Sequence, residues 1–143
     1  GVASTLSQCG LLVVAIVWIT GLVNVWNFMD GIDAIATTQA LLVTACVVCG
    51  GTFFAWMDAR WLAAGWIVLG ALLGFLPFNF PRARIFLGDV GSGALGFVVA
   101  CLLLRATASG GLPWPLALVA VSAFGLDAAR TLGKRVFQRK AWW

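Results

Sequence analysis

The sequence predicts an all-α fold, a polytopic membrane bundle of about five transmembrane helices. The 143 residues are 62% hydrophobic and only 10% charged, whereas charged residues make up roughly a quarter of an ordinary soluble domain. The mean hydropathy is +1.03. The apolar residues also gather into runs that approach the ~20 residues needed for a helix to cross a bilayer.

Five apolar segments predict the helices in order, at about 10–26, 34–55, 61–78, 92–105 and 113–128. The first connection, "NFMDGID", contains two carboxylates, and the second, "WMDAR", is short. The third, "NFPRARIFLGDVGSG", is long and contains Pro, Gly and Arg, whereas the fourth, "ATASGGLPWP", is typical of a turn. We therefore expect a single membrane domain over the whole chain.

Basic residues predict the orientation of these helices. With five spans, the first and third connections lie on the same side as the C-terminal tail. That side receives most of the basic residues: Arg82, Arg84, Arg130, Lys134, Arg135, Arg139 and Lys140. Because an excess of Lys and Arg in short loops marks the cytoplasmic face, we expect the N-terminus outside and the C-terminus in the cytoplasm. The basic tail itself predicts an interfacial anchor on anionic lipid.

Acidic residues follow the same division. The predicted cytoplasmic side receives Asp30, Asp33, Asp89 and Asp127, and only Asp58 falls on the outer side. Carboxylates next to a membrane are costly unless they are paired or hydrated, which makes them candidates for function. Loops also contain charge for solvation alone, so composition leaves both interpretations open.

The stretch "NVWNFMDGIDAIATTQA" has polar side chains at every third position: Asn24, Asn27, Asp30 and Asp33. On a continuous helix each step of three residues slips back by about 60°, so these side chains would spread over half the circumference. Gly31 tolerates a break or a tight turn. We therefore expect the two Asn residues at the end of one helix and the two Asp residues at the start of the next. Capping explains one or two of the four.

The stretch "RIFLGDVGSGALGF" is a glycine-rich turn that leads into an apolar helix. Gly88, Gly91 and Gly93 let backbone amides approach a ligand, and Ser92 can cap the helix, so the turn is typical of an anion site. Asp89 would repel a bare phosphate, which predicts a divalent cation between them, because Mg²⁺ is commonly held by one or two carboxylates and substrate phosphates. Ordinary helix capping by Gly and Ser remains the other interpretation.

Two weaker patterns predict packing. Cys46 and Cys49 form a C-x-x-C inside an apolar run without a nearby His or acid, so we expect small buried side chains instead of a thiol or metal site. Gly70 and Gly74 form a G-x-x-x-G, which is typical of close contact between helices.

Together, "NVWNFMDGID" and "IFLGDVGSGALGF", in that order and separated by two apolar helices, resemble the motifs of the polyprenyl-phosphate N-acetylhexosamine-1-phosphate transferases. This membrane family includes the phospho-N-acetylmuramoyl-pentapeptide translocase of peptidoglycan synthesis and the enzymes that initiate O-antigen and other surface glycans. The resemblance covers the whole chain. The Phe-Met before Asp30 is more similar to the glycan-initiating branch.

The resemblance implies an activity and its partners. An N-acetylhexosamine 1-phosphate is transferred from a UDP-sugar to a polyprenyl (undecaprenyl) phosphate, and UMP is released, in the first membrane step of cell-envelope glycan assembly. The resemblance implies a multi-pass protein of the bacterial inner membrane with its active site on the cytoplasmic face. The expected partners are UDP-N-acetylhexosamine, polyprenyl phosphate and membrane lipid. No nucleic acid is expected, and a homodimer is left open.

The resemblance also implies roles for individual residues. Asp89 is expected to ligate Mg²⁺, with Mn²⁺ as an alternative, and to form the catalytic set with Asp30 and Asp33. The expected substrate-binding residues are Asn24, Asn27, Gly31, Gly88, Gly91, Ser92 and Asp127.

The sequence departs from the family pattern at three points. It has no adjacent Asp-Asp pair and no His, both of which family members have on other cytoplasmic loops, and Ala34 stands where the family has glycine after Asp33. The two absences fit the central-to-late part of a longer transferase and predict that this piece alone is inactive. The alternative functions are a transporter with broken helices and a structural membrane module. A transporter would place its polar residues near the midplane.

Overall fold

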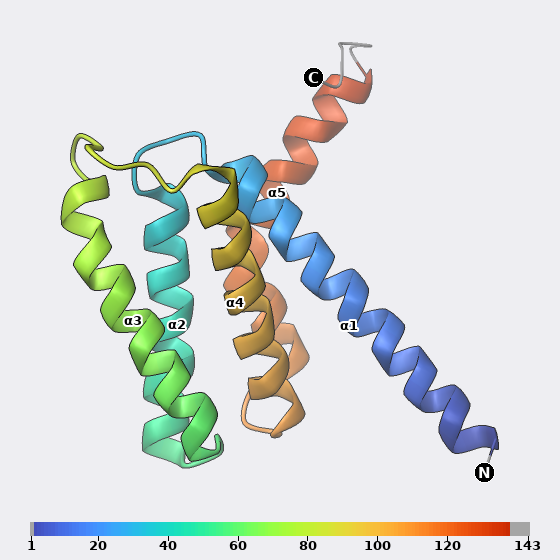
Figure 1. Cartoon of the computed structure of the whole chain (residues 1–143). Coiled ribbons are helices and arrows are strands. Elements are labelled where there is room, and N and C mark those ends of the chain that lie inside the picture. Colours follow the sequence, from blue (N-terminus) through green and yellow to red (C-terminus); the bar gives the residue numbers. More distant parts are fainter. Residues whose placement is uncertain (1, 138–143) are drawn as a thin grey trace.

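The computed structural model describes residues 2–137, which form five α-helices and no strand (Figure 1). They are α1 (Val2–Met29), α2 (Ile35–Phe54), α3 (Ala59–Asn79), α4 (Gly88–Ala108) and α5 (Trp114–Phe137). The all-α fold and the five predicted segments are confirmed. Apart from α2, which is one residue shorter at each end, the helices extend beyond the apolar runs, most of all α1.

Four of these helices are long and apolar enough to cross a bilayer. Within the described residues these spans are Ser7–Met29, Ile35–Phe54, Ala59–Asn79 and Gly88–Ala108. The fifth helix, α5, is not among them. It includes Asp127 and Arg130, which lower its hydropathy. The orientation of the termini stays a prediction, and Arg139 and Lys140 of the predicted anchor lie outside the described residues.

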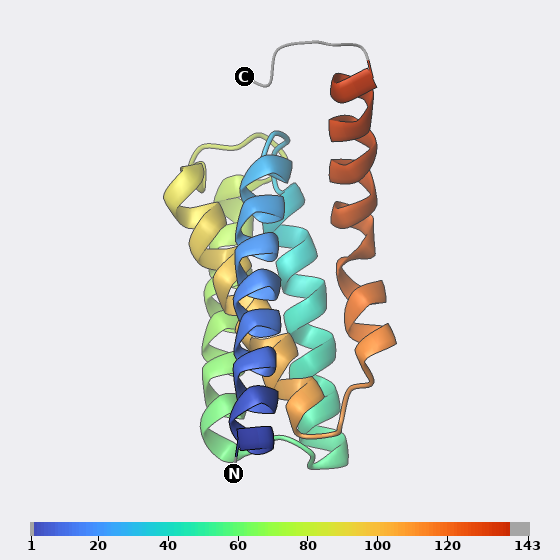
Figure 2. The ribbon, with the colours of Figure 1, turned by 90° about the vertical axis from the view of Figure 1, so that its right-hand side faces the viewer.

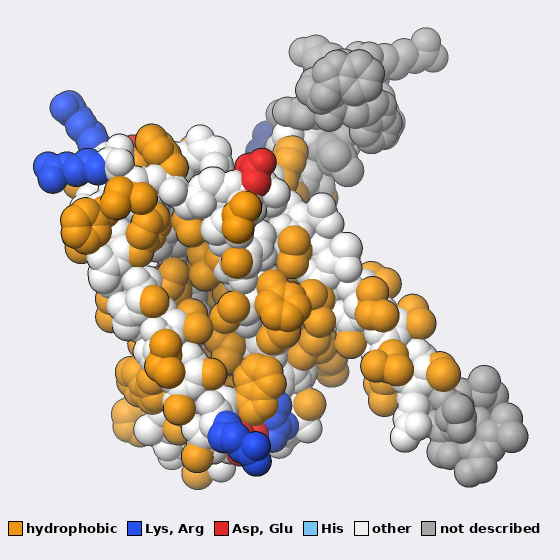
Figure 3. All heavy atoms as spheres, in the orientation of Figure 1, with side chains coloured by type: hydrophobic (Ala, Val, Ile, Leu, Met, Phe, Trp, Pro, Cys, Tyr) orange, Lys and Arg blue, Asp and Glu red, His pale blue; other side chains and the backbone are white. Residues whose placement is uncertain are grey.

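Successive helices run in opposite directions, so the connections alternate between two ends of the bundle (Figures 1 and 2). We call the end that contains Asp30, Asp33 and Asp89 the carboxylate end, and the end that contains Asp58 the distal end. Because α2 has 20 residues, the two ends are about 30 Å apart. Charged side chains gather at these ends, whereas hydrophobic side chains cover most of the surface between them (Figure 3).

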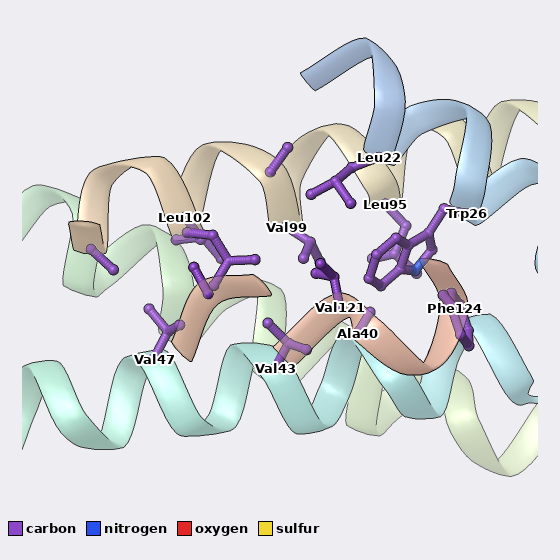
Figure 4. Close-up of a cluster of buried hydrophobic side chains, with 14 of the residues drawn as sticks. Leu22, Trp26, Ala40, Val43, Val47, Leu95, Val99, Leu102, Val121 and Phe124 are labelled. Atoms are coloured by element: carbon purple, nitrogen blue, oxygen red, sulfur yellow. The ribbon is translucent and has the colours of Figure 1, made fainter. Parts of the chain in front are cut away.

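The core lies where α1, α2, α4 and α5 meet (Figure 4). Trp26 of α1 is fully buried, and its indole N–H donates to the carbonyl oxygen of Ala36 at 3.3 Å. Its ring lies 4.9 Å from that of Phe124 in α5, measured between centroids. This contact places the middle of α5 beside the last turn of α1, close to the carboxylate end.

The contact between α1 and α4 depends on Gly96. A Cβ atom at Gly96 would lie 2.8 Å from the carbonyl oxygen of Leu22 and 3.0 Å from the Cα of Val23, so a larger residue requires the two backbones to separate. By contrast, Gly70 and Gly74 have open space beside them within the described part of the chain. The prediction that this glycine pair makes the close contact is therefore wrong for these helices.

Cys46 and Cys49 lie exposed on α2, so the prediction that they are buried is wrong. The pattern of apolar residues in α2 does not distinguish the face that meets other helices from the face that points outward. In a membrane, an outward face meets lipid tails, which are as apolar as a protein core.

Candidate active site

The interruption between α1 and α2 covers residues 30–34 and includes Gly31, as predicted. The residue in the left-handed conformation, however, is Ala34, with φ 63° and ψ 0°. This is the position at which the resemblance led us to expect glycine, and the left-handed conformation favours that residue. Asp30 and Asp33 lie in the turn and not in the first turn of α2, so their predicted place at the start of the helix is wrong. The turn presents both side chains at the carboxylate end.

The loop between α3 and α4 forms the other wall of the site. The carboxylate Oδ2 of Asp33 accepts a hydrogen bond from the backbone N–H of Ala83 at 3.0 Å, which ties this loop to the α1–α2 turn. The side-chain amide of Asn79 donates to the carbonyl oxygen of Ile85 at 3.1 Å. Two segments that are far apart in sequence are therefore held together by polar contacts.

Asn79 is a site residue that the sequence analysis missed. Its side chain is 4% exposed, and its Oδ1 accepts a hydrogen bond from the hydroxyl of Thr37 at 3.0 Å. A buried amide in such a position needs these partners, because an unsatisfied polar group inside a protein is costly. The available signal was an isolated amide at the end of an otherwise apolar helix, next to a polar loop.

A pocket of about 170 Å³ lies between this turn, the loop and the start of α4. Its lining residues are Asp30, Gly31, Ile32, Asp33, Asn79, Phe86, Leu87, Gly88 and Asp89. The two sequence motifs thus contribute to one pocket, and Asp33 and Asp89 share it. The catalytic, metal-binding and substrate-binding roles of these residues stay predictions.

Three residues of the predicted substrate-binding set lie elsewhere on α1 and α5. Asn24 is exposed, and its amide donates to the carbonyl oxygen of Thr20 in its own helix at 2.8 Å. Asn27, also exposed, does not line the pocket. Asp127 is exposed one helical turn after Phe124, near the carboxylate end but outside the pocket.

Gly88 and Asp89 at the start of α4 line the pocket, whereas Gly91 and Ser92 of the same motif do not. Gly88 has φ +63°, a conformation that favours glycine, and directly precedes Asp89 in the first turn. Ser92 is fully buried, and its hydroxyl donates to the carbonyl oxygen of Asp89 at 3.3 Å, so its predicted capping role is wrong. Gly91 lies against Leu87 and outside the pocket.

The pocket concentrates negative charge. Burial raises the pKa of Asp30 above its ordinary value, and the negative charge of Asp89 raises it further. Among the side chains that the structure describes, the ion pair found joins Asp58 and Arg105 at the distal end, and none involves an acid of the pocket. The ionised form of Asp30 is therefore disfavoured by its surroundings, and a bound cation would relieve this repulsion.

The donor set of the pocket fits a hard divalent cation. Carboxylate oxygens are the protein ligands that Mg²⁺ prefers, and Mg²⁺ is usually held by one or two of them together with substrate phosphates and water. No group of three His, Cys, Asp or Glu residues in the described chain is arranged to hold a metal by itself. The arrangement therefore suits a cation that binds together with a phosphate-containing ligand.

The sequence is similar to those of known proteins. The sequence model of glycosyl transferase family 4 matches residues 2–107. A phospho-N-acetylmuramoyl-pentapeptide-transferase of Lactobacillus gasseri is 32% identical over 135 residues, which cover 85% of this chain and 39% of that protein. A decaprenyl-phosphate N-acetylglucosaminephosphotransferase of Mycobacterium tuberculosis is 34% identical over 105 residues, which cover 66% of this chain and 25% of that protein. The chain thus spans less than half the length of these relatives. No solved structure matches it.

Proposed function

Because the chain belongs to glycosyl transferase family 4, we propose that it forms part of an enzyme that transfers an N-acetylhexosamine 1-phosphate from a UDP-sugar to a polyprenyl phosphate and releases UMP. The observation that supports this most directly is the pocket shared by Asp30, Asp33 and Asp89. The pocket lies at one end of a membrane bundle, where a soluble nucleotide sugar and a lipid phosphate can meet. Polar residues at an end, not at the midplane, favour a transferase over a transporter.

Asp89 is the residue that we assign to hold the divalent cation, with Asp30 beside it. Mg²⁺, or Mn²⁺ in its place, supplies positive charge that neutralises the diphosphate and stabilises the charge of phosphoryl transfer. Asp89 is exposed in the first turn of α4 and thus accessible from solution. The raised pKa of Asp30 means that its ionised form is disfavoured in the pocket, and a cation bound beside it would stabilise that form.

Asp33, Asn79 and Phe86 are the residues that we assign to the nucleoside. One oxygen of Asp33 is engaged by Ala83, which fixes the carboxylate while its other oxygen can accept a hydrogen bond from a ligand hydroxyl. Asn79 is held by two hydrogen bonds at the pocket wall. Phe86 is 71% exposed and lines the pocket, and an exposed aromatic ring is suited to stack on a base.

The proposal includes the branch of the family, the membrane in which the protein lies and its orientation there. The Phe-Met before Asp30 favours the glycan-initiating branch, although relatives with names from both branches match the chain. The exposed Arg82 and Arg84 near the pocket favour a cytoplasmic carboxylate end, in the bacterial inner membrane.

A turnover assay tests the proposal. The full-length protein that contains this chain is supplied with UDP-N-acetylglucosamine, polyprenyl phosphate and Mg²⁺ in detergent micelles, and UMP is measured. We expect UMP release that requires both the lipid acceptor and the cation. Release of UMP at the same rate without the lipid acceptor would show that the protein is not such a transferase.

A further inference from the structure

A second pocket, of about 510 Å³, lies at the loop between α3 and α4, and its lining contains two arginines and no acid. Its lining residues are Pro77, Phe80, Pro81, Arg82, Ala83 and Arg84. We propose that Arg82 and Arg84 bind the phosphate of an anionic phospholipid headgroup. This site is separate from the carboxylate pocket, and the inference does not depend on the transferase activity.

Neither arginine of this pocket forms an ion pair among the described side chains. Arg82 and Arg84 are both exposed. Asp33, the acid that contacts this loop, accepts its hydrogen bond from the backbone of Ala83 and not from either guanidinium group. Two guanidinium groups in one pocket attract an anion, and their planar forks match the geometry of phosphate oxygens.

The loop holds the two arginines in a defined arrangement. The backbone N–H groups of Arg84 and Ile85 both donate to the carbonyl oxygen of Phe78, at 2.8 Å and 3.2 Å. Asn79 then holds the same segment through its hydrogen bond to the carbonyl oxygen of Ile85. Because the backbone is already fixed, binding at this loop loses less conformational freedom than binding at a free chain would.

The surroundings of the pocket favour a lipid over a soluble anion. Phe78, Phe80 and Ile85 are 49%, 56% and 50% exposed. They lie at the end of the α3 span, where aromatic and basic side chains typically meet headgroups and the adjoining acyl chains. Basic and hydrophobic side chains lie next to one another at this corner of the molecule (Figure 3). A soluble phosphate would gain nothing from these exposed apolar side chains.

Thermal unfolding of the chain in micelles of a neutral detergent tests this inference. The probes are phosphatidylglycerol, phosphatidylcholine and inorganic phosphate, and the variants are R82Q/R84Q and R60Q. Arg60 is the matched control, since it is exposed at the distal end and has no ion pair among the described residues. Phosphatidylglycerol should raise the unfolding midpoint of the unaltered chain and of R60Q by about 5 °C. R82Q/R84Q should lose more than half of that rise, and the other probes should have little effect.

Several results would overturn the inference. An equal rise in R82Q/R84Q would place the lipid elsewhere, for example on the basic tail that all variants retain. An equal rise with phosphatidylcholine would mean that headgroup charge is irrelevant, and a rise with inorganic phosphate alone would indicate a soluble ligand. If the double variant does not unfold cooperatively, R82Q and R84Q are tested singly. Each should then lose part of the rise, and an unchanged rise in both would also overturn the inference.

Discussion

Asp58 at the distal end has the partners that a carboxylate needs, whereas Asp30 at the carboxylate end has a second carboxylate as its neighbour. Asp58 caps α3 by accepting a hydrogen bond from the backbone N–H of Trp61 at 3.2 Å. Its Oδ2 also accepts hydrogen bonds from Nε and Nη2 of Arg105, at 3.0 Å and 2.7 Å. The fold therefore uses one Asp to join two helices at the distal end. Among the described side chains, the Asp residues of the carboxylate pocket form no ion pair.

The pKa values of the two side chains move in opposite directions. The hydrogen bonds from Arg105 lower the pKa of Asp58, and the one from Trp61 lowers it further. Burial, and then the charge of Asp89, raise the pKa of Asp30. A lowered pKa contributes stability that is present above the unfolded value and is lost as pH falls through the folded value. For Asp30 the sign is reversed, so ionisation of this group at neutral pH opposes folding. Ionisation of Asp30 therefore lowers the stability of the carboxylate end, and the cation that we propose there would offset this loss.

The largest expected effect is the loss of turnover in Asp89→Asn. The amide keeps the shape of the side chain but removes the negative charge that we assign to the cation, so activity of the full-length enzyme should fall by about 100-fold or more. UMP release at saturating substrates provides the measurement. Asp58→Asn is the matched control and should stay near the original rate. A similar loss of activity in both variants would show that Asp89 has no special role in turnover compared with Asp58.

Gly96→Ala should cause the largest loss of stability, because its Cβ atom meets the backbone of α1. Overpacking of this kind costs about 1–3 kcal/mol. Gly70→Ala adds the same methyl group beside open space and should be neutral or stabilise α3 by about 0.5–1 kcal/mol. Thermal unfolding in micelles measures both. Equal midpoints for the two variants would mean that α1 and α4 do not approach closely at Gly96.

Ala34 and Ala55 both adopt the left-handed conformation, one at each end of α2. Ala55 ends α2 at φ 52° and is exposed, so Ala55→Gly should relieve about 1 kcal/mol of backbone strain. Ala34, at φ 63°, is 5% exposed. Ala34→Gly should gain less, since it also removes a buried methyl group worth roughly 0.8 kcal/mol. The unfolding midpoints rank the two variants, and a larger gain at Ala34 would contradict the burial argument.

The smallest expected effect is the opposite change in midpoint of Asp30→Asn and Asp58→Asn, measured with divalent cations removed. Asp30→Asn should raise the midpoint at neutral pH, because it removes a disfavoured charge, and Asp58→Asn should lower it. The gain in Asp30→Asn should shrink as pH falls through the raised pKa of Asp30, because the original side chain then becomes neutral too. A gain that grows at low pH would have the wrong sign for this explanation.

The helices and their ends could be predicted from the sequence because both depend on simple patterns. An apolar run of about 20 residues has few structures open to it in a membrane, and alternating connections then place Asp30, Asp33 and Asp89 at one end. Alternation alone does not bring them into one pocket, since Asp127 lies near the same end and outside the pocket. The side on which each residue of a helix lies was harder to predict, as Cys46 and Cys49 show.

Single-residue details escaped the sequence analysis because they depend on neighbours that are distant in the chain. Gly96 and Gly70 look alike in sequence, and only the position of α1 distinguishes them. Ser92 is fully buried although Asp89, one helical turn before it, is exposed, and this difference is not visible in the motif. The role of Asn79 could not be predicted because it depends on the α3–α4 loop, whose Ile85 carbonyl oxygen accepts a hydrogen bond from the Asn79 side chain.

The most direct test of the central claim is the binding of Mn²⁺ in the presence of UMP, followed by electron paramagnetic resonance. The claim is that the carboxylate pocket holds a divalent cation together with a uridine nucleotide. The full-length protein and Asp58→Asn should bind Mn²⁺ when UMP is present and bind it much more weakly without UMP. Asp89→Asn should lose this nucleotide-dependent binding. Undiminished binding of Mn²⁺ by Asp89→Asn, or an equal loss in Asp58→Asn, would contradict the assignment of the pocket.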